Sequence, residues 1–111
     1  MESMARLDIW SNEDLSDGLR EYVDRRLRFA LDRFVHRLDR LEVRLEDVNG
    51  PRGGLDKHCR IHIVGRPSWR IQVEGAGVSF YDAIDAAAAR ASRSVGRLLG
   101  RLAEHRTEAV V

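Results

Sequence analysis

Three consecutive segments in the middle of the chain alternate apolar and polar residues. They are "RLEVRLEDV" at 40–48, "HCRIHIV" at 58–64 and "WRIQVE" at 69–74. Successive side chains of a β-strand point to opposite faces, so the alternation predicts three strands that each bury one face. The predicted inward-facing residues are Leu41, Val43, Leu45, Cys59, Ile61, Ile63, Trp69, Ile71 and Val73. Three such strands need a covering layer, and this need restricts the fold more than any other feature.

Two further segments have apolar residues at the three- and four-residue spacing of a helix, so each can supply that layer. The first is predicted over about residues 19–38 with Ser16 as its N-cap, and the second over about 80–104 with Ser79 as its N-cap. The apolar face of the first helix consists of Leu19, Val23, Leu27, Ala30, Leu31 and Phe34. The apolar face of the second consists of Phe80, Ile84, Ala87, Ala91, Val95, Leu98 and Leu102.

The segment "RLDIW" at 6–10 predicts one more strand, which precedes the first helix. The element order is then β-α-β-β-β-α. The economical arrangement is an α+β fold, a two-layer sandwich in which a four-stranded sheet carries both helices on one face. The 111 residues suit a single domain, 1–111, with a frayed tail at about 105–111. "NGPRGG" at 49–54 contains three glycines and one proline, which predicts a loop.

The composition indicates a globular protein rather than a disordered or membrane-spanning one. Hydrophobic residues make up 43% and charged residues 33% of the chain. No apolar run is long enough to cross a bilayer, and the start "MESMARLDIW" lacks the features of a secretory signal. Cys59 is the single cysteine, so no intrachain disulfide can form, and a reduced cytoplasmic location is expected.

The net charge of +1 hides an uneven distribution along the chain. Residues 1–17 carry a net charge of −4, whereas residues 86–106 carry +4. The basic part includes a row formed by Arg90, Arg93, Arg97 and Arg101, at spacings of three, four and four. We call this set the arginine row, and the second predicted helix, over about residues 80–104, is expected to carry it. A local basic patch can attract polyanions even when the whole protein is nearly neutral.

The arginine row is expected on a stripe of its own, about 120° around the helix from the apolar stripe. Almost no acidic residue shares that stripe, so ion pairs within the helix do not neutralise it. Guanidinium groups suit phosphate oxygens because they donate planar, paired hydrogen bonds. Two interpretations stay open from the residues alone, a polyanion-binding surface and a solvated helix face.

The first helix adds two arginines that lie near aromatic residues. Tyr22 and Phe29 fall outside its main apolar face, close to Arg26 and Arg33. Such rings can stack on nucleobases. Packing of both rings against the second helix is the favoured interpretation.

Neither a metal site nor a catalytic site is predicted. Cys59 and His62 point to opposite faces of a strand, and Cys59 is expected to be a small core residue. His58 and His62 are about 13 Å apart at strand rise, which is too far for one ion. The sequence contains no P-loop and no nucleophile elbow. We therefore expect no cofactor, no metal, no small-molecule substrate and no enzymatic activity.

The ordered set of segments resembles a known family. "LREYVDRRL" at 19–27, the alternating strands and "YDAIDAAAARASRSVGRLLGR" at 81–101 are similar to the ribosome hibernation promoting factors. These include the ribosome-associated inhibitors once called sigma factor modulation proteins. The resemblance covers about residues 5–104 and is to the short form. It implies the β-α-β-β-β-α fold, and a cytoplasmic stress factor that binds the small ribosomal subunit in the mRNA and tRNA channel and inhibits translation.

The resemblance also implies which residues contact ribosomal RNA. By position they are Arg90, Arg93 and Arg97, with Arg101 continuing the row, and more loosely Arg26 and Arg33. Arg52 and Lys57, in and beside the glycine-rich loop, are further candidates for RNA contact. The alternatives are another RNA-binding module of the same fold and a protein-interaction domain that binds no RNA.

Overall fold

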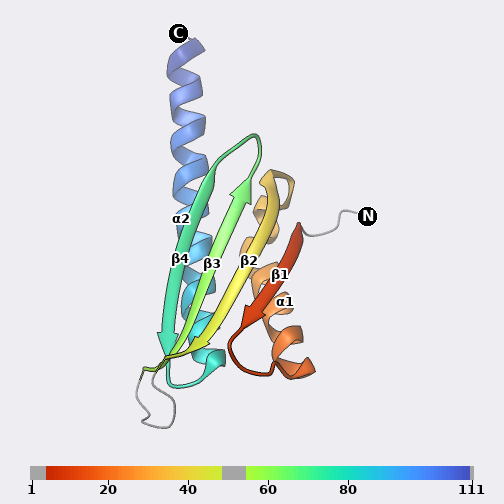
Figure 1. The fold of residues 1–111 in the computed structure, drawn as a ribbon. Helices are drawn as coiled ribbons and strands as arrows, with labels where there is room; N and C mark the ends of the chain where they lie inside the picture. The colour runs from red at the N-terminus through yellow and green to blue at the C-terminus, as the bar shows by residue number, and fades with distance from the viewer. Residues whose placement is uncertain (1–4, 49–54, 111) are drawn as a thin grey trace.

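The computed structural model describes residues 5–48 and 55–110, with side chains as far as Glu104. Within them the chain forms a single mixed sheet and two long helices (Figure 1). The elements are β1 (Arg6–Ser11), α1 (Asp17–Leu31), the 3₁₀ helix η1 (Asp32–Arg37), β2 (Leu38–Asp47), β3 (Lys57–Gly65), β4 (Arg70–Gly77) and α2 (Phe80–Val110). The predicted order and the α+β class are confirmed.

The four strands follow each other across the sheet in the order β1-β2-β3-β4. β1 pairs with β2 in parallel, and α1 makes the crossover between them, whereas the other two pairs are antiparallel. Figure 1 shows both helices behind the same face of the sheet. No helix of the described residues covers the opposite face of the sheet, and we call it the open face.

Both helices begin at the predicted N-caps. The hydroxyl of Ser16 accepts a hydrogen bond from the backbone N–H of Leu19 at 3.1 Å. The hydroxyl of Ser79 accepts one from the N–H of Asp82, also at 3.1 Å. Each bond satisfies a donor that the first helical turn leaves unpaired.

The core lies between the helices and the strands, as the alternation predicts. The register places Leu41 beside Ile63, and Val43 beside Ile61, which in turn pairs with Val73. These five side chains are buried. Ile71 was expected to be equally buried, but it is half-buried.

The first helix ends earlier than its apolar spacing predicts. α1 stops at Leu31, and the chain tightens into η1 before β2 begins at Leu38. The predicted helix end at Leu38 is therefore wrong. Leu38 lies opposite Gly65 in the sheet and is only 1% exposed, so it is buried as part of β2 instead.

Two glycines of β4 let α2 lie close to the sheet. A Cβ atom on Gly75 would come within 2.5 Å of the backbone of Ala83 and Ala87, and one on Gly77 within 2.5 Å of Asp82. These approaches are shorter than any real Cβ contact, so both positions require glycine at this helix–sheet distance.

The second half of α2 extends past the sheet. Figure 1 shows its C-terminal end projecting well beyond the strands, and the helix continues to Val110, beyond the expected end near Glu104. Val95 is fully buried, whereas Leu102 is 37% exposed. The predicted burial of Leu102 is therefore wrong, because the sheet no longer lies beneath the helix at that point.

Candidate nucleic-acid interface

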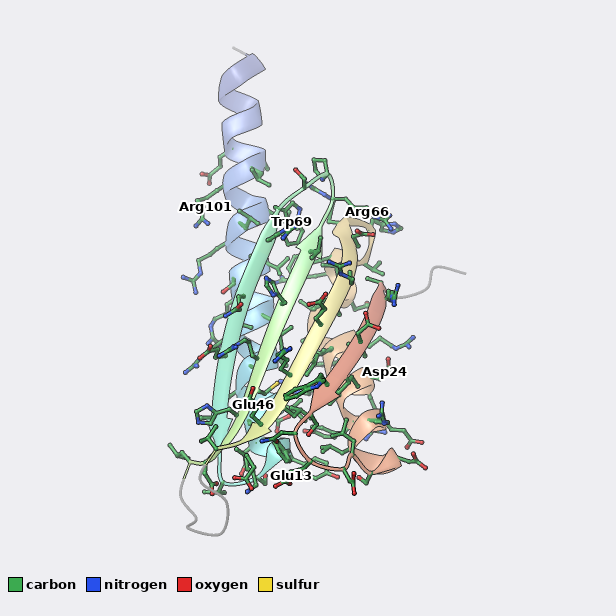
Figure 2. The ribbon with its side chains drawn as sticks, viewed as in Figure 1. Glu13, Asp24, Glu46, Arg66, Trp69 and Arg101 are labelled. Carbon is green, nitrogen blue, oxygen red and sulfur yellow. The ribbon has the colours of Figure 1, made fainter. Side chains whose placement is uncertain are left out.

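The arginine row lies on α2, so we call it the α2 arginine row from here on, and it runs along the side of α2 that borders strand β4. All four side chains are exposed, and Figure 2 shows Arg101 pointing away from the helix beyond the edge of the sheet. Arg90 donates a hydrogen bond to the backbone carbonyl of Glu74 on the edge strand. Arg93, Arg97 and Arg101 have no acidic partner among the described residues. Three guanidinium groups of the row are thus available to an anionic ligand.

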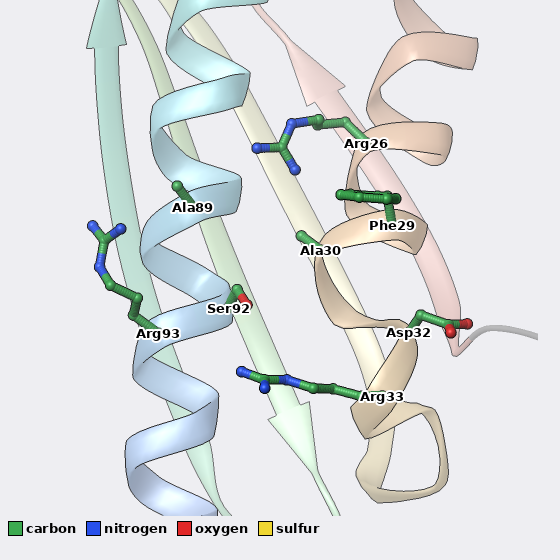
Figure 3. A pocket seen from close by; sticks show the side chains of 8 residues that line it. All are labelled: Arg26, Phe29, Ala30, Asp32, Arg33, Ala89, Ser92 and Arg93. Atoms are coloured by element: carbon green, nitrogen blue, oxygen red, sulfur yellow. The ribbon is translucent and has the colours of Figure 1, made fainter.

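A groove between α1 and α2 forms a second basic surface. It has a volume of about 500 Å³ and is open to solvent along its length. Its lining consists of Arg26, Phe29, Ala30, Asp32, Arg33, Ala89, Ser92 and Arg93. In Figure 3 the side chains of Arg26 and Arg33 point from the α1 side toward α2. Arg93 also borders the shallow groove between α2 and β4, so it links the two basic surfaces.

Asp85 of α2 holds one of the groove arginines. The Nε atom of Arg26 lies 3.2 Å from Oδ1 of Asp85, and the hydroxyl of Tyr22 donates a short hydrogen bond to the same oxygen. This hydrogen bond raises the pKa of Tyr22 above its usual value. The Tyr22 ring packs edge-on against Tyr81, with 4.8 Å between the ring centroids. The predicted packing of Tyr22 against the second helix is confirmed, and Arg26 is partly neutralised.

Arg33 is positioned by an aromatic ring rather than by an acid. Its guanidinium carbon lies 4.6 Å from the ring centroid of Phe34, a geometry typical of cation–π contact. A Cβ atom on Gly96 would lie 3.4 Å from Nη2 of Arg33, so the guanidinium group lies within van der Waals range of α2. Arg33 has no acidic partner within the described part of the chain, so its positive charge stays available to a ligand.

Phe29 does not pack as predicted. Its side chain is 83% exposed, so the expected packing of this ring against the second helix is wrong. Helical geometry explains the difference, because Phe29 falls outside the stripe that Leu27 and Leu31 bury. The position outside the apolar face is visible in the sequence, but the sequence does not reveal that α2 leaves the ring uncovered.

The two remaining candidates lie apart from these surfaces or outside the described residues. The Nζ atom of Lys57 lies 2.9 Å from Oδ2 of Asp47 and 3.7 Å from Oδ1 of Asp56. The hydrogen bond to Asp47 raises the pKa of Lys57. The ammonium group is thus already engaged by carboxylates. Arg52 lies outside the described residues.

Charge is also distributed unevenly from one end of the molecule to the other. Figure 2 places Glu13 and Glu46 near the lower end of the sheet and Arg66 and Arg101 near the upper end. The acidic end holds the exposed loop between β1 and α1, and the basic end holds the projecting part of α2. These labelled side chains are therefore acidic at the Glu13 end of the molecule and basic at the Arg101 end.

Cys59 is fully buried in the core, as predicted, and burial raises its pKa to about 12. Among residues 5–48 and 55–104, no group of three or more His, Cys, Asp or Glu side chains is arranged to hold a metal ion. None of the described helices combines the length and the apolar character that crossing a membrane requires.

The fold and its surface define a small α+β sandwich with one strongly basic helical side. Residues 10–103 match the family described as Sigma 54 modulation protein / S30EA ribosomal protein. The chain belongs to this family, and the resemblance to the ribosome hibernation factors is thereby confirmed. No curated protein matches the chain in sequence.

Two solved structures share the fold. The crystal structure of the Thermus thermophilus Protein Y N-terminal domain aligns with a TM-score of 0.68 at 25% identity, covering 86% of this chain and 99% of that one. A ribosomal subunit interface protein from Coxiella burnetii aligns with a TM-score of 0.71 at 14% identity, covering 86% of this chain and 98% of that one. At 14% identity the second likeness supports the fold alone.

Proposed function

We propose that this protein is a ribosome-associated hibernation factor that binds the small ribosomal subunit in the mRNA and tRNA channel and inhibits translation in the cytoplasm. Membership of the family supports the ribosome as the partner. The α2 arginine row is the observation that supports the proposed contact surface. In it, Arg93, Arg97 and Arg101 face solvent without an acidic partner in the described structure.

In the proposed mechanism the protein inhibits translation by occupying the mRNA and tRNA channel, and it catalyses no reaction. Arginines that bind phosphates release condensed counterions, which gives affinity that does not depend on base sequence. Shape and backbone contacts are the usual means by which proteins recognise folded RNA. A rigid domain held in the channel by such contacts excludes mRNA and tRNA by volume alone. We expect the row to act together with Arg33 and with the partly neutralised Arg26 of the helix groove.

Co-sedimentation with purified small subunits over a salt series tests this function. The variant R93Q/R97Q removes two charges, and glutamine keeps the helical preference. We expect binding about tenfold or more weaker, and a salt dependence shallower by roughly 0.7–0.9 logarithmic units per lost contact. Inhibition of translation in a cell-free system should fall in parallel.

The matched control removes two arginines from the open face instead. Arg60 and Arg70 are exposed on neighbouring strands of that face, so R60Q/R70Q should bind like the parent. Equal binding by the parent and R93Q/R97Q across the salt series would show that the row is a solvated helix face. Equal affinity of the parent for small subunits and for unstructured RNA would favour the general RNA-binding alternative.

A further inference from the structure

Phe29 is the one aromatic residue of α1 and η1 that stays largely exposed. Tyr22 packs against Tyr81, and Phe34 is half-buried beneath Arg33. A phenylalanine ring left 83% exposed forgoes most of the stabilisation that burial would provide. Single exposed apolar residues are common on protein surfaces, so the position of this ring between arginines, rather than its exposure alone, supports a binding role.

The surroundings of the ring are basic and shallow. Arg26, Phe29 and Arg33 follow each other at spacings of three and four, so they share one side of the helical segment. Figure 3 shows the Phe29 ring between the two arginine side chains. The rest of the groove includes Ala30, Ala89 and Ser92, whose short side chains leave the ring uncovered.

The charge of the groove indicates the chemical class of the ligand that it would bind. Three arginines line it together with Asp32, and Asp85 pairs with Arg26. Arg33 and Arg93 have no acidic partner among the described residues, so an anionic group is favoured there. The ring favours a flat, polarisable group, since aromatic side chains stack on nucleobases of any sequence. An unpaired nucleotide supplies both groups at once. The groove volume of about 500 Å³ lies within the range of small-molecule sites.

We propose that Phe29 stacks against one unpaired base of ribosomal RNA, while Arg33 and Arg93 hold the neighbouring phosphates. This inference rests on the function proposed above and adds a non-ionic contact to it. Arg33 is suited to this task because Phe34 already orders its guanidinium group. Figure 3 shows the Arg93 side chain pointing away from α1, toward the β4 side of α2, so it is placed to hold a phosphate where the RNA strand passes from the groove to the α2 arginine row.

Three substitutions at one position test the stacking contact. F29L keeps an apolar side chain but removes the π face, whereas F29Y and F29W retain one. Because the side chain is exposed, none should change the thermal midpoint appreciably. We expect F29L to bind small subunits about 5- to 100-fold more weakly than the parent. F29Y and F29W should bind within about threefold of the parent if stacking is the contact.

The salt series separates this contact from the arginine contacts. Base stacking does not involve counterion release. F29L should therefore show the same slope of affinity against salt as the parent, in contrast to R93Q/R97Q. Parent-like affinity of F29L would overturn the stacking proposal and leave the ribosome-binding function intact. A parent that fails to bind small subunits would overturn the function, and the stacking proposal with it.

A photo-crosslink identifies the class of molecule that covers the ring. p-Benzoylphenylalanine in place of Phe29 should crosslink to a ribosomal RNA nucleotide in the bound complex. Crosslinking to a ribosomal protein instead would overturn the proposal, as would a weakened F29L whose binding neither F29Y nor F29W restores.

Discussion

The open face of the sheet and the exposed side of α2 are both rich in arginine, but they differ in how those arginines are paired. On the open face Arg6 lies 3.3 Å from Asp8, Arg40 3.2 Å from Glu42, and Arg60 3.0 Å from Glu74. On α2, Arg93, Arg97 and Arg101 have no acidic partner within the described residues. The number of arginines therefore does not mark a candidate site in this protein, whereas the absence of partners does.

The geometry of each element produces this difference. In the sheet, the register sets Trp10, Arg44, Arg60 and Glu74 side by side across four strands. The two arginines are neighbours, but a ring lies on one side of the pair and a carboxylate on the other, so each arginine has a compensating contact. The guanidinium carbon of Arg44 lies 4.6 Å from a Trp10 ring centroid. On α2, spacings of three and four bring like charges together, which costs about 0.2–0.5 kcal/mol per pair. A polyanion would relieve that cost. Arg44 and Arg70 are the exceptions on the open face, since neither has an ion pair among the described residues, and Arg44 lies over the Trp10 ring instead.

A substitution that forces α2 away from the sheet should have the largest effect on this comparison. In G75A the added methyl group meets backbone atoms of Ala83 and Ala87 at 2.5 Å, so we expect a loss of about 2–4 kcal/mol in unfolding free energy. G100A is the matched control, because a Cβ atom there has no neighbour within 4 Å. It should stabilise the protein by up to about 1 kcal/mol. Urea denaturation of both variants measures the two effects, and a parent-like midpoint for G75A would contradict the close helix–sheet contact.

Giving the α2 row an acidic partner should make it resemble the open face. Ser94 lies four residues after Arg90 and three before Arg97, in the groove beside β4. S94E should therefore weaken binding to small subunits about tenfold and flatten its salt dependence. S94Q, which has nearly the same shape without the charge, should bind like the parent. The reverse change on the open face, E42Q, releases Arg40 and should not increase affinity. Comparable effects of S94E and S94Q would mean that size rather than charge is responsible.

The smallest expected effect concerns the hydrogen bond between Tyr22 of α1 and Asp85 of α2. Y22F removes the hydrogen bond to Asp85 and should cost about 1 kcal/mol near neutral pH. Because folding raises the pKa of Tyr22 above its ordinary value of 10.0, the protonated hydroxyl contributes stability that is present below that value. The contribution disappears as the pH rises through the higher pKa of the folded state.

Thermal unfolding of the parent and Y22F from pH 7 to 11 checks this link. The two stabilities should converge above pH 10, because ionisation removes from the parent what the substitution removes at all pH values. A stability difference that stays constant across the range would show that the hydroxyl does not stabilise the folded state through Asp85. Lys57 remains in both proteins, so its own raised pKa cancels in the comparison.

The sequence predicts those features that depend on local pattern. Alternation identifies the buried faces of β2 and β3 through Leu41 and Ile61, and a serine before each helix identifies its start. The exposed α2 arginine row follows from helical spacing in the same way. These patterns repeat over several residues, so each prediction has independent support from its neighbours.

Features that depend on distant parts of the chain are not predictable in this way. Periodicity continues to Leu102 although the sheet does not reach that far. The carboxylate that engages Arg26 belongs to Asp85, far along the chain. Tyr22 and Phe29 occupy similar positions outside the apolar face, yet one packs against Tyr81 and the other stays exposed. In each case the outcome is decided by where the second helix lies, which local sequence does not specify.

The polarity between the Glu13 end and the Arg101 end has a kinetic consequence. In the field of a large polyanion such a molecule experiences a torque, so it turns its basic end forward before any atoms touch. Fewer encounters then begin in an unproductive orientation, and the association rate constant rises. Because counterions screen the field within about 8–10 Å at physiological ionic strength, this advantage fades as salt is added. We expect the association rate constant to fall with added salt more steeply for the parent than for R93Q/R97Q, in which the basic end carries less charge.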